Sequence, residues 1–192
     1  MEQTLARPLT RAQQARRQRV IDAAMALGLD GGYDAVQMRD VATRAQVALG
    51  TIYRYFRSKD ELLAAALVEW AGTIERQVSA RPPRGATIAD RLVDVLRRAS
   101  RAMERDPNLT AAFVTAIASP DPAVHECQQD VAAVLVQLVS GPLSGIPTEE
   151  RDGIVRVLSW VWFGALLGWV NGWSNAGTVG DELEAAARLL VR

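Results

Sequence analysis

Apolar residues recur along most of the chain at spacings of three and four residues, the period of an α-helix. No segment sustains the strict alternation of apolar and polar positions that a half-buried strand requires. In the first such stretch Val20, Ala24 and Leu27 share one face. We expect a helix here that starts after Thr10 as its N-cap and ends at about Asp30, before two glycines. The pattern predicts an all-α fold.

Breaks in the same pattern divide the rest of the chain into eight further helices. Proline and glycine clusters and capping residues mark where each helix stops and the next begins. The expected helices cover about residues 37–45, 50–56, 59–80, 87–105, 109–118, 123–140, 148–173 and 181–191. We therefore predict nine helices in two domains, a small one over residues 1–58 and a larger one over residues 59–192.

Composition narrows the class of protein. Apolar residues make up 49% of the chain and charged residues 23%, which indicates a globular fold. One cysteine, Cys127, excludes an intrachain disulfide and fits the cytoplasm, and no apolar leader precedes the first helix. His125 is the only histidine, so ligands for a zinc ion are too few. We find no phosphate-binding glycine loop and no nucleophile elbow, and expect no catalytic residues, no metal and no cofactor.

The formal net charge is zero, but the charges are unevenly distributed. Residues 1–60 hold ten basic and six acidic residues, and the remainder holds twelve basic and sixteen acidic ones. A net charge of +4 on the first third suggests a module that meets a polyanion, with chance asymmetry as the alternative. Arg7 and Arg11 are candidates for an arm in the minor groove of DNA, or simply solvate the first helix.

The helices at 37–45 and 50–56, joined by a tight turn, predict a helix-turn-helix whose second helix enters the DNA major groove. Its inner positions are Val36, Val41, Ala42, Val47, Ile52 and Phe56. The residues predicted to contact DNA are Arg39, Leu49, Gly50, Thr51, Tyr53, Arg54 and Tyr55. Lys59 starts the next helix, where its ammonium and the free backbone N–H groups attract phosphate. The alternative is a helical hairpin in an ordinary core, with both tyrosines packed inside.

The run from Val47 to Lys59 resembles the DNA-binding signature of the TetR family, and residues 36–42 fit its second helix. The resemblance implies a ligand-responsive, homodimeric repressor that binds a near-palindromic operator and dimerises through its last two helices. Gln37 departs from the family pattern, which often has a capping threonine or serine there. Segments 36–39, 53–56 and 101–107 resemble the actinobacterial repressors of sterol catabolism, which implies a steroid or fatty acyl-coenzyme A effector. An activator, or an all-α acyl-binding protein or enzyme, remains an alternative.

Residues 157–173 are the most unusual segment, because glycines and bulky residues separate onto opposite sides of the expected helix. The bulky side carries Trp162, Leu166, Trp169 and Trp173. We expect the glycine side to pack on a second copy and the tryptophan side to face the core, with the reverse as the alternative. The predicted dimer residues are Gly164, Gly168, Gly172, Leu183, Ala187 and Leu190. The apolar run is shorter than the roughly 20 residues that a membrane span needs, so we expect no membrane insertion.

A hydrophobic effector requires a pocket between the helices of the larger domain. Its candidate residues are Met103, Phe113, Ile117, Trp162, Leu166 and Trp169, all equally explained as core. Arg97, Arg101 and Arg105 recur every four residues and are placed to meet the phosphates of an acyl-coenzyme A. The alternative is a solvated face, with Asp94 and Arg98 as a local ion pair.

Overall fold

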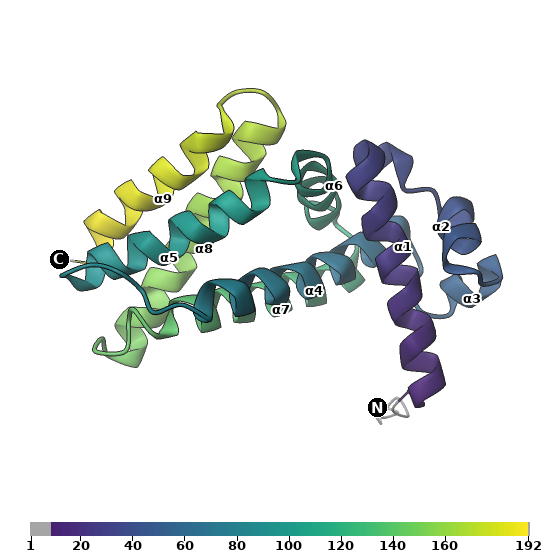
Figure 1. The fold of residues 1–192 in the computed structure, drawn as a ribbon, viewed down its shortest axis with the longest axis horizontal. Helices are drawn as coiled ribbons and strands as arrows, with labels where there is room; N and C mark the ends of the chain where they lie inside the picture. The colour runs from purple at the N-terminus through teal and green to yellow at the C-terminus, as the bar shows by residue number, and fades with distance from the viewer. Residues whose placement is uncertain (1–8, 192) are drawn as a thin grey trace.

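The computed structural model describes residues 9–191, which form nine α-helices and no strand (Figure 1). The helices are α1 (Arg11–Ala35), α2 (Met38–Ala45), α3 (Leu49–Tyr53), α4 (Lys59–Ser79), α5 (Ile88–Glu104), α6 (Pro107–Ile117), α7 (Pro122–Ser140), α8 (Thr148–Val170) and α9 (Ala176–Leu190). The predicted all-α fold, with three helices in a small N-terminal part and six in the larger part, is confirmed.

The predicted ends of α1 agree with the backbone. Thr10 caps the helix, because its hydroxyl accepts the Gln13 N–H while the Gln13 side chain accepts the Thr10 N–H. The helical path breaks at Gly31 and Gly32, where the φ angle of Gly32 is +71°. One more turn follows the break and carries Tyr33 toward the start of α4.

Three other boundaries differ from the expected ones: α3 ends at Tyr53 rather than at residue 56, and two differences lie around the loop between α8 and α9. Gly172, with a φ angle of +75°, stops α8 at Val170, and the Trp173 N–H donates to the Gly168 carbonyl at 2.8 Å. After this tight stop Asn175 adopts the extended N-cap conformation, so α9 begins at Ala176 rather than at residue 181. Gly172 therefore acts as a helix stop and not as part of a packing stripe.

The buried residues form two clusters that α4 connects. The first contains α1 to α3, α6 and the first half of α4, including residues 62–67. The second contains α5, α7, α8 and α9 with Ile74 and Val78 from the far half of α4. Figure 1 shows α7 running alongside α4, and α1 crossing the end of the larger domain next to α6. Because α4 belongs to both clusters, a shift of this helix reaches both parts of the molecule.

Candidate nucleic-acid interface

The helix-turn-helix has the predicted core. Val36, Val41 and Ile52 are fully buried, Phe56 is 2% exposed, and Ala42 is buried beside them. Val47 is half-buried and packs on the same cluster. This packing fixes the angle between α2 and α3, so the alternative of two tyrosines filling an ordinary core holds only for Tyr55, described below.

The turn between α2 and α3 depends on one residue in a left-handed conformation. Gln46 has a φ angle of +55°, and its N–H lies against the carbonyls of Ala42 and Thr43 at the end of α2. The Val47 N–H then donates to the Ala42 carbonyl at 3.0 Å. These bonds end α2 abruptly, and α3 starts after a turn of three residues, so that the outer face of α3 projects from the molecule.

The predicted DNA-contacting residues separate into an exposed and a packed set. Gly50, Tyr53, Arg54 and Arg39 are exposed, with Tyr53 at 50%, and no atom lies within 4 Å of a Cβ built on Gly50. Thr51 is half-buried at the edge of this face. The outer side of α3 is thus open to a partner that approaches the backbone closely.

Leu49 and Tyr55 belong instead to the packed set. Both are half-buried and pack against the core cluster, and the Tyr55 ring centroid lies 6.4 Å from that of Phe56. The sequence placed them on the outer face with Tyr53, but α3 ends at Tyr53 and the chain turns inward after it. Their side chains support the position of α3.

Lys59 begins α4 and is held by Tyr33. Its ammonium lies 3.6 Å from the Tyr33 ring centroid and donates to the Tyr33 carbonyl at 3.2 Å. The Tyr33 hydroxyl in turn donates to Asp60 at 2.5 Å. Burial, together with this hydrogen bond, raises the pKa of Tyr33 to about 12. The phenol therefore keeps its proton at physiological pH. Sequence reasoning identified Lys59 but missed Tyr33, for which the break at Gly32 was the available signal.

The start of α4 is capped by Ser58 and Glu61. The Ser58 hydroxyl accepts the Glu61 N–H at 3.0 Å, and the Glu61 carboxylate accepts the Arg57 N–H at 2.6 Å. The start of α2 is not capped in this way, because the Gln37 amide donates to the Asp34 carbonyl at 2.8 Å and makes no cap hydrogen bond. The weakness predicted for Gln37 as a cap is confirmed.

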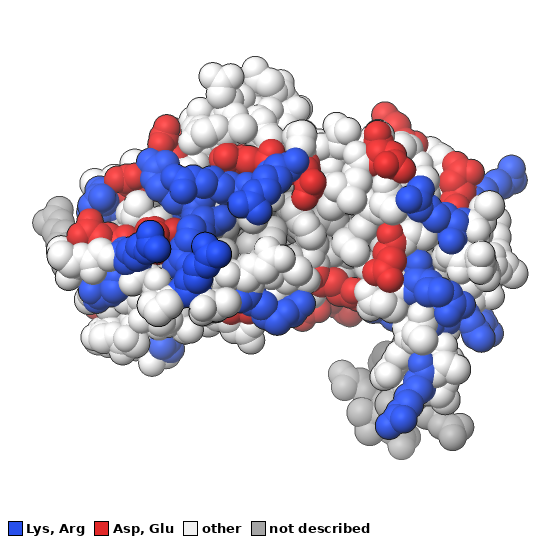
Figure 2. Space-filling view, viewed as in Figure 1, with Lys and Arg blue, Asp and Glu red and all other residues white. Residues whose placement is uncertain are grey.

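Several basic residues of the small domain are occupied within the protein. Arg17 pairs with Glu69 of α4 at 3.2 Å and lies over the Phe56 ring, and Arg44 pairs with Asp30 at 3.3 Å. Figure 2 shows basic side chains along α1 and beside α2 and α3. Arg11 is the first residue of α1, so it is helical and exposed rather than part of an extended arm, and Arg7 lies outside the described residues.

Comparison with known proteins agrees with this geometry. The profile of bacterial regulatory proteins of the tetR family matches residues 20–66, and the tetracyclin repressor-like C-terminal domain matches residues 85–190. The HTH-type transcriptional repressor KstR of Mycobacterium tuberculosis is 41% identical over 181 residues, covering 94% of this chain and 82% of KstR. The chain belongs to the TetR family.

Solved TetR structures show the same fold. A TetR transcriptional regulator from Rhodococcus sp. RHA1 superposes with a TM-score of 0.81 at 32% identity, covering 93% of this chain and 96% of that one. Thermus thermophilus FadR, a repressor crystallised with lauroyl-CoA, superposes with a TM-score of 0.72 at 21% identity, covering 91% and 92%. The second likeness, at 21% identity, shows a common fold.

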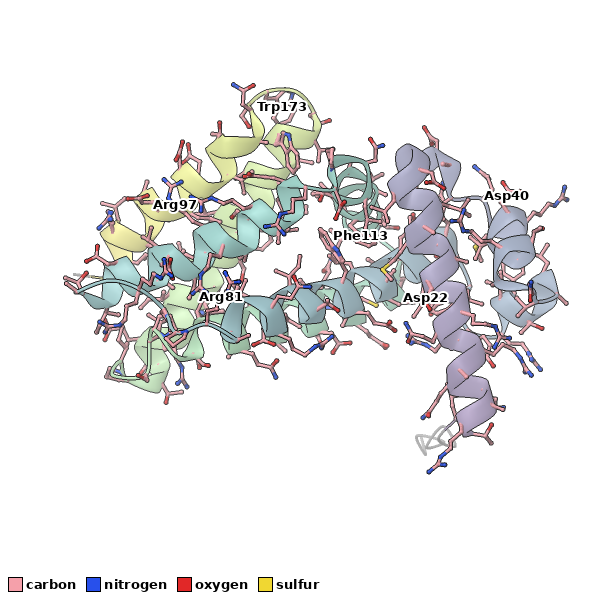
Figure 3. All side chains as sticks on the ribbon, viewed as in Figure 1. Asp22, Asp40, Arg81, Arg97, Phe113 and Trp173 are labelled. Carbon is pink, nitrogen blue, oxygen red and sulfur yellow. The ribbon has the colours of Figure 1, made fainter. Side chains whose placement is uncertain are left out.

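In this TetR protein the predicted effector residues are largely closed core. Phe113, Ile117 and Leu166 are 1%, 8% and 7% exposed, and the Phe113 ring packs on Trp70 with centroids 5.3 Å apart. Figure 3 shows Phe113 at the middle of the molecule, on α6. Open depressions of about 440 and 400 Å³ lie elsewhere, one along residues 119–128 and the other between α4, α5 and the end of α7.

The remaining predicted effector residues, Met103, Trp162 and Trp169, are half-buried and pack on the second core. One atom among them is unusual. The indole N–H of Trp162 is buried and has no hydrogen-bond acceptor within residues 9–191. Because buried donors are almost always paired, the Trp162 N–H is available to donate to a bound molecule.

The predicted arginine row on α5 has two different halves. Arg97 pairs with Asp181 and Glu184 of α9, at 2.7 and 2.6 Å, and these hydrogen bonds raise the pKa of its guanidinium above the usual value. Figure 3 shows Arg97 between α5 and α9. Arg101 and Arg105 are exposed. Arg97 therefore joins two helices and is not available to a ligand phosphate. The predicted pair of Asp94 and Arg98 is present at 2.8 Å.

The inward side of α8 is largely the predicted one, because Trp162, Leu166 and Trp169 pack within the subunit. The prediction was wrong for Trp173, which is 76% exposed because α8 ends at Val170 and Trp173 lies in the loop after it. The outward side differs from the predicted glycine stripe. Gly164 is exposed, but Gly168 is buried beside Ser174 and Gly172 lies beyond the helix end. Of the stripe, only Gly164 lies on the outward surface of α8.

The predicted contribution of α9 to the dimer also changes. Leu183 and Ala187 are fully buried within the subunit, where α9 packs on both α5 and α8, so they do not face a partner. The prediction that these residues share one apolar face of α9 was correct, but that face packs within the subunit and not on a second copy. Leu190 is half-buried, and Leu189 beside it is 75% exposed.

An exposed apolar face takes their place. Val157, Trp160 and Gly164 lie within about 60° of one another around α8, and Trp160 is 70% exposed. Within the most apolar stretch of this 23-residue helix, only 22% of residues are buried in the subunit. By length and composition α8 is long and apolar enough to span a membrane. Its first half, however, carries charged residues at 149–152 and 156, and its inner side packs in the core, which favours a helix of a globular domain. An apolar face of this kind marks a binding surface.

Proposed function

We propose that the protein is a transcriptional repressor that binds a near-palindromic operator as a homodimer and is released by a hydrophobic effector. The observation that carries this is the rigidly packed α3, whose exposed side presents Gly50, Tyr53 and Arg54. The 41% identity to KstR, which is named a transcriptional repressor, supports repression rather than activation. Because a repressor must reach operator DNA, the proposed function implies a cytoplasmic protein.

The proposed DNA-binding domain comprises residues 1–58 and the proposed effector and dimerisation domain residues 59–192. The exposed side of α3 enters the major groove, where Arg54 pairs with guanine or phosphate and Thr51 and Tyr53 contribute hydroxyl groups. Arg39 and Lys59 contact phosphates on either side, and Leu49 and Tyr55 support α3 from within. Two-fold symmetry repeats these contacts one helical turn away along the DNA.

The proposed dimer surface is the apolar face of α8 with the outer side of α9. Val157, Trp160, Gly164 and Leu189 are its exposed apolar members, with Leu190 at its edge. We propose that a second copy of the chain buries this surface, because the chain belongs to the TetR family and TetR regulators dimerise. Gly164 lets the two α8 helices approach closely, and Trp160 supplies a large apolar area beside it.

The proposed effector is a hydrophobic molecule, with fatty acyl- or steroid acyl-coenzyme A thioesters as the leading class. The FadR structure with lauroyl-CoA supports this class, because that fold accommodates an acyl chain. We place the effector between Met103, Phe113, Ile117, Leu166 and the two tryptophans, with Arg101 and Arg105 left for the phosphates. Binding requires these core side chains to open. By linkage, an effector that weakens operator binding is itself bound more weakly by the operator complex.

Operator binding tests the proposal directly. Replacing Tyr53 with alanine is expected to lower affinity for duplexes flanking the gene about thirtyfold, near 1 kcal/mol for each subunit of the dimer. Tyr53→Phe separates the hydroxyl from the ring. Fluorescence anisotropy across a salt series is the measurement, with a reporter gene assayed with and without the protein to distinguish repressor from activator. Absence of any salt-sensitive, sequence-specific binding by the wild-type dimer would refute the proposed function.

The buried Trp162 N–H predicts that the effector carries an oxygen acceptor where its apolar part is bound. Trp162→Phe is expected to weaken an oxygen-bearing ligand about tenfold and to leave operator affinity unchanged. Native mass spectrometry against steroids, fatty acids and their coenzyme A thioesters provides the ligand, and titration gives its affinity. Trp169→Phe is the matched control, because its N–H is not a buried unpaired donor. Equal effects of the two variants would show that Trp162 acts only by packing.

A further inference from the structure

A single serine–aspartate pair joins the starts of α4 and α7. The Ser58 hydroxyl accepts the Glu61 N–H at 3.0 Å as the cap of α4, and it donates its own proton to Asp121 at 3.1 Å. The other carboxylate oxygen of Asp121 accepts the Ala123 N–H at 3.0 Å and so caps α7. The two residues are 63 positions apart in the chain. Each side chain thus holds its own helix and the neighbouring one.

The chemistry fixes the direction of this hydrogen bond. A hydroxyl has one proton and two lone pairs, whereas a carboxylate offers only acceptors. Ser58 therefore accepts within α4 and must donate to Asp121, in a hydrogen bond to a charged acceptor that is stronger than a neutral one. Neither residue can move relative to the other without losing this bond, and a shift of Ser58 moves the first turn of α4.

The pair lies at the joint between the two parts of the molecule. Val124 is fully buried, and Cys127 packs against the cluster that contains residues 62–67 of α4. The Gln128 side chain donates to the Ile117 carbonyl at 2.7 Å, so the start of α7 is also held to the end of α6. Lys59 follows Ser58 directly. A displacement of α6 or α7 would therefore be transmitted to Lys59 through the hydrogen bond between Ser58 and Asp121.

We propose that Asp121 is a positioning residue for operator binding, which fixes Lys59 against α7 through Ser58. The proposal rests on the proposed function, because it takes Lys59 as a phosphate contact. Core packing between α4 and α7 holds the two helices together along their length, and the Ser58–Asp121 bond ties the first turn of α4 to the start of α7. Tyr33 holds the same turn from the side of α1, through Lys59 and Asp60. Asp121 touches no DNA and acts through another residue.

Asp121→Ser is the variant that isolates this bond. Serine caps helices about as well as aspartate, so α7 keeps its cap, but the shorter side chain cannot serve Ala123 and Ser58 together. Operator affinity is expected to fall roughly tenfold, the size of one hydrogen bond to a charged group. In a Lys59→Ala background the same change is expected to alter affinity less than about twofold, because the contact that Asp121 positions is already gone.

Operator affinity is measured by fluorescence anisotropy. The DNA is a duplex from the region flanking the gene, chosen because the wild-type dimer binds it. Thr87→Ala is the matched control. The Thr87 hydroxyl caps α5 by accepting the Asp90 N–H at 3.0 Å, and no cross-helix bond from Thr87 is present within residues 9–191, so operator affinity should be unchanged. Hydrogen exchange gives a second readout: operator binding should slow exchange of the first amides of α7 in the wild type and not in Asp121→Ser.

The outcomes separate this proposal from the proposed function. If the wild type binds no duplex, both fail. If the wild type binds and Asp121→Ser binds equally well, the positioning role of Asp121 alone is overturned. A tenfold loss that persists in the Lys59→Ala background also overturns it, because the effect then does not pass through Lys59. Should Asp121→Ser fail to fold, Asp121→Asn keeps the α7 cap with a weaker cross-helix bond and is expected to show a smaller loss of the same kind.

Discussion

Trp160→Glu is expected to separate the dimer into monomers and to abolish operator binding at concentrations where the wild type is saturated. Trp160 is 70% exposed in the single subunit and lies beside Gly164 on the outer side of α8. A central aromatic residue of an interface commonly contributes about 2 kcal/mol or more, and a two-fold axis uses it twice. A total near 4 kcal/mol weakens dimerisation about a thousandfold.

Sedimentation velocity over a concentration series measures this dissociation, and anisotropy follows operator binding on the same samples. Because Trp160 projects into solvent within the subunit, the melting of the isolated fold should change little. Gly164→Leu provides an independent variant, since a Cβ at 164 meets no atom within 4 Å inside the subunit. Gly145→Leu is the matched control, because the turn between α7 and α8 offers equal room away from this face. A dimeric Trp160→Glu variant that binds operator normally would place the interface elsewhere.

The residues of this face also show how far the sequence leads. Helical periodicity correctly placed Trp162, Leu166 and Trp169 inside, because an apolar line at one angle needs a core. Periodicity did not distinguish Gly164 from Gly172, because the residue type alone does not tell whether a glycine lies inside a helix or ends it. Gly172 stops α8 by its positive φ angle, which depends on the path of the chain into α9.

Leu183 and Ala187 illustrate a second limit. Helical periodicity correctly places both residues on one apolar face of α9. It does not tell whether that face packs on another helix of the same subunit or on a second copy. In the structure α9 packs on both α5 and α8, and Arg97 links α5 to α9 through Asp181. The outer side of α9, where Leu189 is exposed, became visible only when the inner side was assigned.

The helix-turn-helix was predicted most completely, because its core residues and its turn are local features of one short segment. Tyr55 is the exception. It was predicted with Tyr53 among the outer positions of a helix that continues to residue 56, but α3 ends after Tyr53 and the next residues turn inward. The contact between Lys59 and Tyr33 spans 26 positions and depends on the break at Gly32, which local patterns do not resolve.

Lys59→Ala is expected to lower operator affinity about a hundredfold and to reduce the slope of log affinity against log salt by about two. Each subunit would lose one phosphate contact, and each neutralised phosphate contributes close to one unit of slope. The fold should persist, because the Tyr33–Asp60 hydrogen bond and the Ser58 cap do not use the lysine. Loss of the cation–π contact costs about 1 kcal/mol of stability.

Lys59→Arg is the control that keeps the charge. Arginine can remain over the Tyr33 ring and still reach a phosphate, so most of the salt slope should survive. The comparison distinguishes two roles for the same ammonium. If Lys59 only secures the joint between α1 and α4 through Tyr33, Lys59→Ala will lower the melting temperature and leave the salt slope unchanged. If it binds phosphate, the slope falls in Lys59→Ala and is retained in Lys59→Arg. Tyr33 holds the ammonium at the first turn of α4, where the free N–H groups also favour an anion, so the geometry favours phosphate binding.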